Sequence, residues 1–262
     1  MKPVRTASVV TVCALVLLLV PTVIVIIASL STGTVISFPP HGLTLHWYSD
    51  MLANDAVWAA LRNSLYVAIL SVAINLVCGV PAALALPRVG RHSRLVFTVL
   101  LSLGLSSPTI VSAFGFFDVY SRISLGGSLT AVGVAIAVTS FPFMLWTVLA
   151  AIEDQDPDLV PAAATMGADP VEQLLFVRLP LLMPGIVTGA LIVFVLSITD
   201  FVVSQVLTTV DNQTLPVFIY SGLRGAISPS LGAVSALFIL VAAAVFVIVL
   251  RLGKVERFLF RA

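Results

Sequence analysis

Long apolar runs separated by short polar segments repeat along the whole chain. A helix needs about 20 apolar residues to cross the hydrocarbon core of a membrane. Six runs are long enough, and they predict transmembrane helices over residues 8–30, 63–86, 95–116, 129–152, 180–203 and 231–251. The runs do not alternate apolar and polar positions as the strands of a membrane barrel do. The pattern therefore predicts an all-α membrane protein with six transmembrane helices.

Composition agrees with this class. Hydrophobic residues make up 60% of the 262 positions and charged residues 10%, against about 45–50% and about 25% in an ordinary soluble domain. The net charge of +1 gives no electrostatic reason to expect a nucleic-acid partner. Cys13 and Cys78 lie inside apolar runs without the spacing of metal ligands, so we expect no metal site.

The basic residues predict which side of the membrane each loop faces. With six spans, both termini share one side. Cytoplasmic loops carry an excess of Lys and Arg, and placing the termini in the cytoplasm leaves only Arg62, Arg122 and Arg224 outside. The basic residues then inside are Lys2, Arg5, Arg88, Arg91, Arg94, Arg178, Arg251, Lys254, Arg257 and Arg261. We therefore expect both termini and the loop 153–179 in the cytoplasm.

A polar island from Glu153 to Arg178 separates the fourth run from the fifth. Five of the twelve acidic residues of the chain lie in its first seventeen positions, which indicates a segment outside the bilayer. Local rules predict a first short helix in the island. Asp158 is placed to cap that helix, Pro161 lies in its first turn, and Gly167 has the position of a glycine that ends a helix.

A second short helix is expected in the same island. Asp169, Pro170 and Glu172 have the spacing of a capping box with proline at the first helical position. We expect this helix to run to Arg178 and to end at Pro180, where the next span begins.

The island has the features of a docking element. Its first helix carries small side chains at Ala162, Ala163 and Ala164, which permit close approach of a partner. A packed loop without a partner stays open as the alternative. The chain has no GxxxxGK[ST] phosphate loop and no HExxH or GxSxG motif. We therefore expect neither an enzyme nor a cofactor in this chain, and a source of energy outside it.

The island also resembles a known motif. Pro161-Ala162-Ala163, Gly167 and Leu179-Pro180 resemble the cytoplasmic Glu-Ala-Ala loop of the permease subunits of binding-protein-dependent ABC importers. Pro161 stands where the family carries Glu, so a polar contact of that Glu with the ATPase is either lost here or supplied by Asp158. The positions that the resemblance implies for coupling to an ATPase are Asp158, Pro161, Ala162, Ala163, Ala164, Gly167, Asp169 and Glu172.

A closer resemblance, to the spermidine and putrescine permeases within that family, extends over nearly the whole chain. The matching stretches are His46-Trp47-Tyr48-Ser49, Ser107-Pro108-Thr109-Ile110-Val111, 197–204, 215–221 and Ser228-Pro229. The resemblance implies a type I importer permease fold, with 1–262 as one transmembrane domain in the bacterial inner membrane. It also implies a second homologous permease subunit, two copies of an ATPase that binds ATP and magnesium, an extracytoplasmic binding protein, and contact with membrane lipid.

Thr109 departs from the polyamine pattern. Polyamine permeases can carry an acidic residue at its place, and Thr109 cannot offer a charge to a cationic amine. Relatives for other solutes, such as aminoethylphosphonate or ferric iron, share much of the same pattern. The resemblance therefore favours a polyamine and leaves these other solutes open.

Asp200 is the one acidic residue that the pattern places deep in a span or at its outer edge. Carboxylates at that depth are costly and mark functional positions by default. Asp200 would offer a cationic solute a counter-charge, and the alternative is an Asp near the interface that is solvated or caps the segment that follows. The residues expected along the substrate path are Asp200, Ser197, Thr199, Ser204, Trp47, Ser107 and Thr109.

Other residues inside the runs fit helix packing. Asn75 suits hydrogen bonding between helices as well as contact with a solute, and Gly185 and Gly189 have the spacing of a packing face. The competing function is a transporter driven by an ion gradient, with Asp200 as the ion site. Its typical inverted repeats and paired broken helices are not found in the sequence. A membrane scaffold without transport is the third hypothesis.

Overall fold

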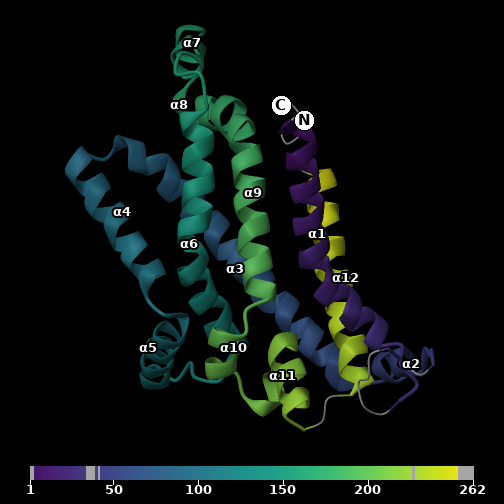
Figure 1. The fold of residues 1–262 in the computed structure, drawn as a ribbon. Coiled ribbons are helices and arrows are strands. Elements are labelled where there is room, and N and C mark those ends of the chain that lie inside the picture. Colours follow the sequence, from purple (N-terminus) through teal and green to yellow (C-terminus); the bar gives the residue numbers. More distant parts are fainter. Residues whose placement is uncertain (1–2, 34–38, 41, 226–227, 253–262) are drawn as a thin grey trace. The chain divides into compact units, whose positions relative to one another are not determined.

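The computed structural model describes residues 3–33, 39–40, 42–225 and 228–252. These residues are predominantly helical, and the described segments contain no strand of a sheet (Figure 1). The all-α prediction is confirmed. The chain divides into two compact units, Met1–Leu61 with Leu215–Val241 and Arg62–Thr214 with Ala242–Ala262. Helices α3 (Asp55–Ala85) and α12 (Pro229–Leu252) each contribute to both units.

The first unit contains α1 (Pro3–Ala28), α2 (His46–Leu52) and α11 (Leu215–Gly225), with parts of α3 and α12. Two hydrogen bonds tie α2 to the residues that follow α1. The Trp47 indole N–H donates to the Ser31 carbonyl at 2.8 Å, and the hydroxyls of Tyr48 and Ser29 lie 2.7 Å apart. The start of α12 approaches the same place, because a Cβ on Gly232 would lie 3.1 Å from the Ser29 Cβ.

The second unit is organised around α6 (Leu129–Glu153) and α9 (Leu179–Ile198), which run side by side (Figure 1). The predicted packing face of α9 makes this contact. A Cβ on Gly185 would lie 2.5 Å from the Ala151 Cβ and 2.8 Å from the Thr147 carbonyl oxygen. A Cβ on Gly189 would meet the Thr147 hydroxyl and the Met144 sulfur. The two glycines therefore set how closely α9 approaches α6.

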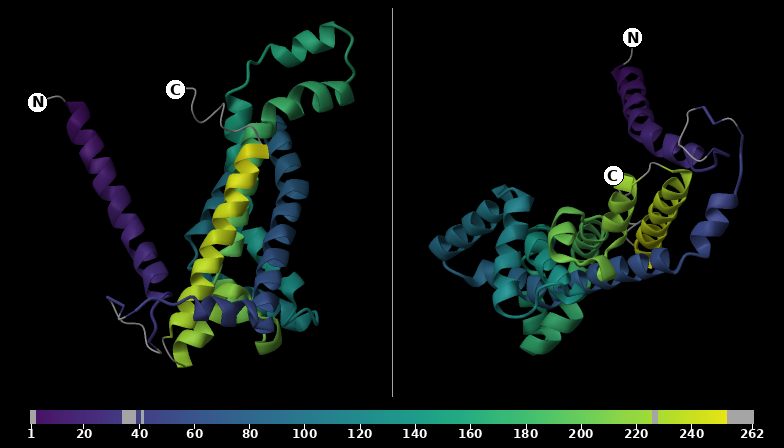
Figure 2. Two further views of the ribbon diagram at one scale, coloured as in Figure 1. Left: turned by 90° about the vertical axis from the view of Figure 1, so that its right-hand side faces the viewer. Right: turned by 90° about the horizontal axis from the view of Figure 1, so that it is seen from below.

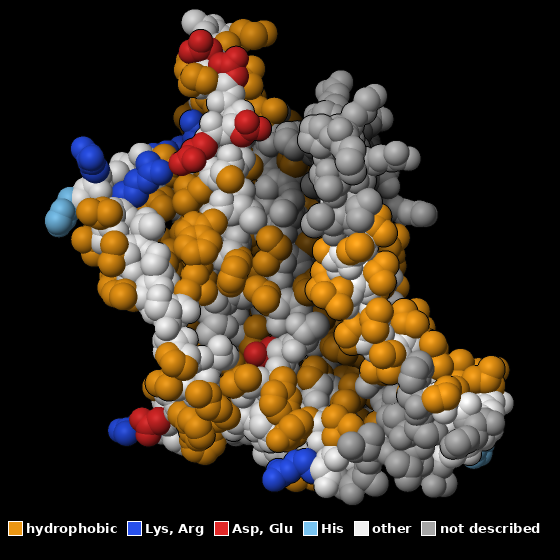
Figure 3. Space-filling view, viewed as in Figure 1, with side chains coloured by type: hydrophobic (Ala, Val, Ile, Leu, Met, Phe, Trp, Pro, Cys, Tyr) orange, Lys and Arg blue, Asp and Glu red, His pale blue; other side chains and the backbone are white. Residues whose placement is uncertain are grey.

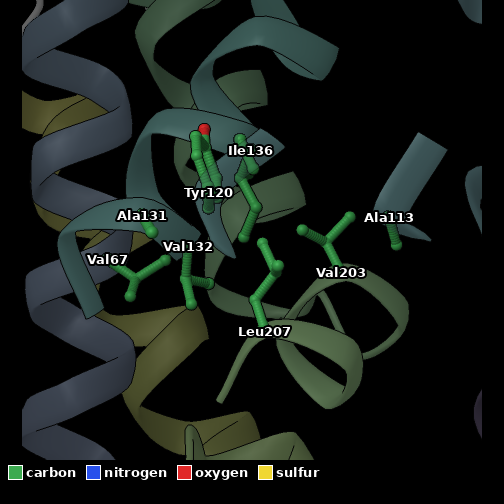
Figure 4. Close-up of a cluster of buried hydrophobic side chains, with 9 residues drawn as sticks. Val67, Ala113, Tyr120, Ala131, Val132, Ile136, Val203 and Leu207 are labelled. Atoms are coloured by element: carbon green, nitrogen blue, oxygen red, sulfur yellow. The ribbon is translucent and has the colours of Figure 1, made fainter. Parts of the chain in front are cut away.

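A hydrophobic cluster fills the space between α6, α5 (Thr109–Arg122) and α10 (Val202–Leu207) (Figure 4). Tyr120 of α5 packs there with Val132 and Ile136 of α6 and with Val203 and Leu207 of α10. A second cluster lies along α3, α6 and α9. Apolar packing thus holds α5 and α10 in place, and with them the polar residues at the breaks that precede these helices.

Five helical runs in the described residues are long and apolar enough to cross a membrane. Their apolar parts are Thr11–Ala28, Asp55–Arg88, Leu129–Glu153, Pro170–Ile198 and Pro229–Ile248. The second of them joins α3 to the short helix η1 (Leu86–Arg88). These five runs correspond to five of the six predicted spans. The prediction of one helix over 95–116 is wrong.

Two helices replace that predicted span. α4 (Arg91–Ser106) and α5 are bent by 101° at Ser107-Pro108. Ser107 has an extended backbone (φ −72°, ψ 133°), as the residue before a proline prefers. Pro142 and Pro184 lie inside α6 and α9 without breaking them. α4 has no buried side chain, unlike α6, so little packing opposes the bend.

The helix that follows the polar island also differs from the prediction. Pro180 does not end it, because the helical backbone passes from α8 (Pro170–Glu172) through a π-helical turn, η2 (Gln173–Arg178), directly into α9. The wider π turn leaves room for a proline, which has no N–H and whose ring clashes with an ordinary helical turn. At its other end α9 stops at Ile198, short of the predicted boundary at 203.

Candidate functional site

The first helix of the polar island, α7 (Leu159–Thr165), ends at Gly167 as predicted. Gly167 has φ +92°, a conformation that glycine adopts at little cost. Its N–H donates to the Ala164 carbonyl at 3.0 Å, and the N–H of Ala168 donates to the Ala163 carbonyl at 3.1 Å. These two bonds form a Schellman motif. Gly167 therefore fixes the direction in which the chain leaves α7.

The predicted capping box starts the second helix. One carboxylate oxygen of Asp169 accepts hydrogen bonds from the N–H groups of Val171 and Glu172, each at 2.8 Å. The Glu172 carboxylate accepts one from the Asp169 N–H at 2.9 Å. Pro170 occupies the first helical position. Ordered turns on both sides of Ala168 thus give the island a defined shape.

Asp158 does not cap α7 with its side chain, and that prediction is wrong. Asp158 precedes the helix, but its backbone is helical (φ −84°, ψ −15°) and its carboxylate makes no capping bond. A cap requires an extended backbone and a free N–H at the second or third helical position. Pro161 occupies the third position and has no N–H. The turn is held instead by the Asp158 N–H, which donates to the Asp156 carboxylate at 2.9 Å.

The island presents an exposed surface. α7 projects beyond the ends of α6 and α9 in two views (Figures 1 and 2), and acidic side chains gather at that end (Figure 3). Large apolar side chains are nevertheless exposed, and the three most exposed are Met166 at 89%, Phe176 at 75% and Val171 at 61%. Ala162 and Ala164 are exposed beside them, and Ala163 is half-buried. Apolar side chains exposed together indicate an interaction surface.

A cavity of about 260 Å³ lies where α4 meets α5, and we call it the Asp200 cavity. Ser107 and Thr109 line it from that break, Thr139 and Ser140 line it from α6, and Asp200 lines it from the break after α9. The structure thus brings together three of the predicted path residues, which come from separate parts of the sequence. The cavity combines a carboxylate with hydroxyl groups, and none of the described residues that line it is basic.

Asp200 has a structural role beside its place in the cavity. One of its carboxylate oxygens accepts hydrogen bonds from the N–H of Ser204 at 2.9 Å and from the Ser204 hydroxyl at 3.1 Å. It therefore caps α10, which is the alternative that the sequence left open. Capping and contact with a solute are compatible, because the residue also lines the cavity.

Four other predicted path residues, Ser197, Thr199, Ser204 and Trp47, do not line this cavity. Ser204 lies next to it, bonded to the Asp200 carboxylate. Ser197 is buried, and its hydroxyl has no hydrogen-bond partner among the described residues. The Thr199 hydroxyl donates to the Val195 carbonyl at 2.6 Å. Trp47 belongs to the first unit, where its indole is bonded to Ser31.

The sequence analysis missed three hydroxyl residues of the Asp200 cavity. Ser112 lies one helical turn after Thr109, and residues with that spacing share a helix face. Thr139 and Ser140 form a polar pair inside the apolar run 129–152. That pair is a signal which a search for polar positions inside the spans would find.

Asn75 joins two helices by hydrogen bonds. Its side-chain amide in α3 donates to the Ala137 carbonyl at 3.1 Å and to the Ser140 hydroxyl at 3.3 Å, both in α6. It also donates to the Ser71 carbonyl at 3.0 Å. Asn75 is fully buried and does not line the Asp200 cavity, so its contacts favour the helix-packing interpretation.

Comparison with known proteins adds a family. The family model described as "Binding-protein-dependent transport system inner membrane component" matches residues 56–255. The chain is 28% identical to the spermidine/putrescine transport system permease protein PotC of Escherichia coli (strain K12), over 85% of this chain and 84% of the relative. It is 25% identical to the putrescine transport system permease protein PotI of the same strain, over 76% and 73%. A putative ABC transporter permease protein, ORF1 of Streptomyces antibioticus, is 31% identical over 81% and 94%.

Solved structures share the fold. A bacterial alginate ABC transporter, in complex with a periplasmic protein bound to an alginate pentasaccharide, superimposes with a TM-score of 0.69 at 18% identity, covering 99% of this chain and 96% of that one. The MetNI methionine ABC transporter in an inward-facing conformation gives a TM-score of 0.65 at 20% identity, covering 77% and 97%. These likenesses extend the ABC permease fold over most of the chain.

Proposed function

The chain belongs to the family of binding-protein-dependent transport system inner membrane components, and from that membership we propose that it forms half of the translocation path of an ATP-driven importer for a polyamine. The polyamine assignment rests on the residues that line the Asp200 cavity. Among the residues that the structure describes, one carboxylate, five hydroxyl groups and no basic side chain line this cavity. A protonated amine has only hydrogen-bond donors to offer, so its ligands are acceptors of this kind.

Thr109 and Asp200 together support a polyamine. Polyamine permeases can carry an acidic residue at the place of Thr109, which is the departure noted in the sequence. Both residues line the same cavity, so Asp200 supplies from the facing side the charge that Thr109 lacks. The cavity is smaller than the about 300–1,000 Å³ usual for a drug-sized ligand, in keeping with a slim solute whose path is shared with a second permease subunit.

The proposal places both termini and the polar island in the cytoplasm. It counts six spans, with α4 and α5 together as one broken span, and treats 1–262 as one transmembrane domain. Three of the basic residues counted for the cytoplasm lie at one end of the second unit, which supports this orientation. Arg88 and Arg178 line one cavity, and Arg94 pairs with Glu153, which lines the same cavity. Of the other basic residues counted for the cytoplasm, Lys2, Lys254, Arg257 and Arg261 lie outside the described residues.

Energy reaches the path through the island. The proposal assigns α7, Gly167 and the capping box to contact with an ATPase, which binds the ATP and magnesium. Pro161 then meets the ATPase where relatives carry Glu. A second homologous permease chain, two copies of the ATPase, and an extracytoplasmic binding protein complete the complex in the inner membrane. Family membership favours this assembly over a transporter driven by an ion gradient.

A reconstitution tests the proposal. The chain is placed in proteoliposomes with its second permease subunit and ATPase, and ATP hydrolysis is measured while the binding protein is presented with spermidine, putrescine, aminoethylphosphonate or ferric iron. We expect stimulation of hydrolysis and uptake with the two polyamines. Stimulation by one of the other solutes alone would replace the polyamine assignment, and no stimulation by any loaded binding protein would count against the importer itself.

A further inference from the structure

A second charged cavity, of about 560 Å³, lies where the polar island meets the ends of α3 and α6, and we call it the arginine cavity. Arg88 of η1 and Arg178 of the π turn line it, together with Glu153 at the end of α6 and Asp156 in the following turn. Leu84 and Leu182 add an apolar wall. The cavity therefore joins charged residues of the island to the apolar ends of the spans.

The charged residues that line this cavity form no ion pair with one another. Glu153 is already paired, because its carboxylate accepts a hydrogen bond from the Arg94 guanidinium at 3.3 Å. Asp156 is engaged in the turn before α7 through the Asp158 N–H. The side chains of Arg88 and Arg178 make no hydrogen bond and no ion pair with any residue that the structure describes. Two unpaired arginine side chains thus line the cavity, whose carboxylates are bonded to other groups.

Gln155 adds a second, independent indication of a ligand. It lines the same cavity, and its amide nitrogen is buried without a hydrogen-bond partner among the described residues. A buried donor that lacks an acceptor destabilises the folded chain, because it has given up its hydrogen bond to water. A ligand that carries acceptor oxygens would satisfy this donor and both guanidinium groups.

We propose that the arginine cavity binds the phosphodiester headgroup of an anionic phospholipid. Guanidinium groups match the oxygens of a phosphate in geometry and in charge. Basic pockets at the cytoplasmic ends of transmembrane helices bind anionic headgroups in this way. Leu84 and Leu182 provide the apolar surface that a lipid needs next to its headgroup, and a soluble phosphate ester does not need it.

A lipid bound at this site would lie next to α7. Val160 and Pro161 of α7 also line the cavity, so a bound headgroup would contact the helix to which the proposed function assigns the ATPase contact. An effect of lipid on transport rests on that function. Binding of the lipid does not, since it requires only the full-length chain and its membrane.

The test measures binding on the purified full-length chain. Native mass spectrometry counts retained phosphatidylglycerol, with phosphatidylcholine as the neutral lipid. We expect preferential retention of phosphatidylglycerol, and about fivefold weaker retention for Arg88→Gln and for Arg178→Gln, the effect of one basic side chain near an anionic surface. Glu153→Gln frees Arg94 and should strengthen retention. Arg122→Gln is the matched control, because Arg122 is 75% exposed at the end of α5 and pairs with Asp118, and it should change nothing.

Three results would overturn the proposal. The first is equal retention of the two lipids by the unmodified chain. The second is unchanged retention of phosphatidylglycerol by the double variant Arg88→Gln with Arg178→Gln. This result counts against the lipid site even if the double variant no longer binds the ATPase. The third is displacement of the lipid by millimolar inorganic phosphate or glycerol phosphate, which would identify a soluble ligand. Arg88→Lys with Arg178→Lys should recover part of the retention, which separates lost charge from misfolding.

Discussion

The carboxylate of Asp200 is bonded twice to Ser204, once through the backbone N–H and once through the hydroxyl. The first bond starts α10, and the second uses a side chain that is itself fully buried. The same carboxylate lines a cavity with Ser107 and Thr109. Asp200 therefore caps a helix and also contributes a carboxylate to the cavity that we propose for the solute, and suitable substitutions separate these two roles.

Asp200→Asn should retain the cap and lose the charge. Asparagine caps helices about as well as aspartate, so we expect an unchanged thermal midpoint in detergent. A hydrogen bond to a charged group contributes about 1.5–3 kcal/mol, so uptake of a polyamine should fall at least about tenfold. Uptake is measured in proteoliposomes that contain the whole importer. Ser204→Ala is the control, because it removes one bond to the cap and leaves the charge. Unchanged uptake with Asn would remove Asp200 from the path.

Gly167→Arg should uncouple the ATPase from the permease. No heavy atom of the described residues lies within 4 Å of a Cβ built on Gly167, so the added side chain starts in open space. Two effects are expected: a cost of about 1–2 kcal/mol for a side chain in a left-handed conformation, and added bulk on the surface that the proposed function assigns to the ATPase contact. We expect stimulated ATP hydrolysis to be lost while the chain stays in the membrane.

Gly167→Asn provides the matched control for that experiment. Asparagine tolerates the left-handed conformation better than other residues with a side chain, and it is smaller than arginine. It should retain most of the stimulation. Normal stimulation with arginine would refute the docking role of α7, and equal losses with both residues would attribute the effect to the turn alone.

Gly189→Ala should weaken the packing of α9 on α6. The added methyl group meets the Thr147 hydroxyl and the Met144 side chain, and overpacking of this kind costs about 1–3 kcal/mol. We expect a lower thermal midpoint of the purified chain. Gly90→Ala should leave it unchanged, because nothing lies within 4 Å of its Cβ and its φ is −57°. Equal midpoints for the two variants would contradict the close approach at Gly189.

Sequence reasoning succeeded where a feature depends on its near neighbours. The capping box at Asp169 and the turn at Gly167 need only residues a few positions away, and both have the expected hydrogen bonds. The predicted cap at Asp158 fails for local reasons as well, because its backbone is helical and Pro161 removes one of the two N–H groups that a cap can bind. The long helices follow from the length of the apolar runs. The packing of α9 on α6 follows from the spacing of Gly185 and Gly189.

Other features depend on tertiary packing and could not be predicted from the sequence. Pro108 and Pro142 look alike in the sequence, yet only Pro108 interrupts its helix, because α6 is held by buried side chains and α4 has none. The Asp200 cavity forms where three parts of the chain meet: the break before α5, helix α6 and the break after α9. The sequence indicated polar residues at the two breaks but not in α6. Thr139 and Ser140 complete the cavity from α6, and no spacing rule connects them with Asp200.

Asn75→Ala should lower the stability of the contact between α3 and α6. The side-chain amide donates to the Ala137 carbonyl and the Ser140 hydroxyl across the two helices, and such bonds between membrane helices contribute about 0.6–2 kcal/mol. We expect a lower thermal midpoint with uptake per folded molecule unchanged, because Asn75 does not line the Asp200 cavity. Ser140→Ala is the comparison. It removes the weakest of these bonds and one hydroxyl of the cavity, so it should lower uptake with a smaller loss of stability. A selective loss of uptake in Asn75→Ala, at an unchanged midpoint, would instead give Asn75 a place on the substrate path.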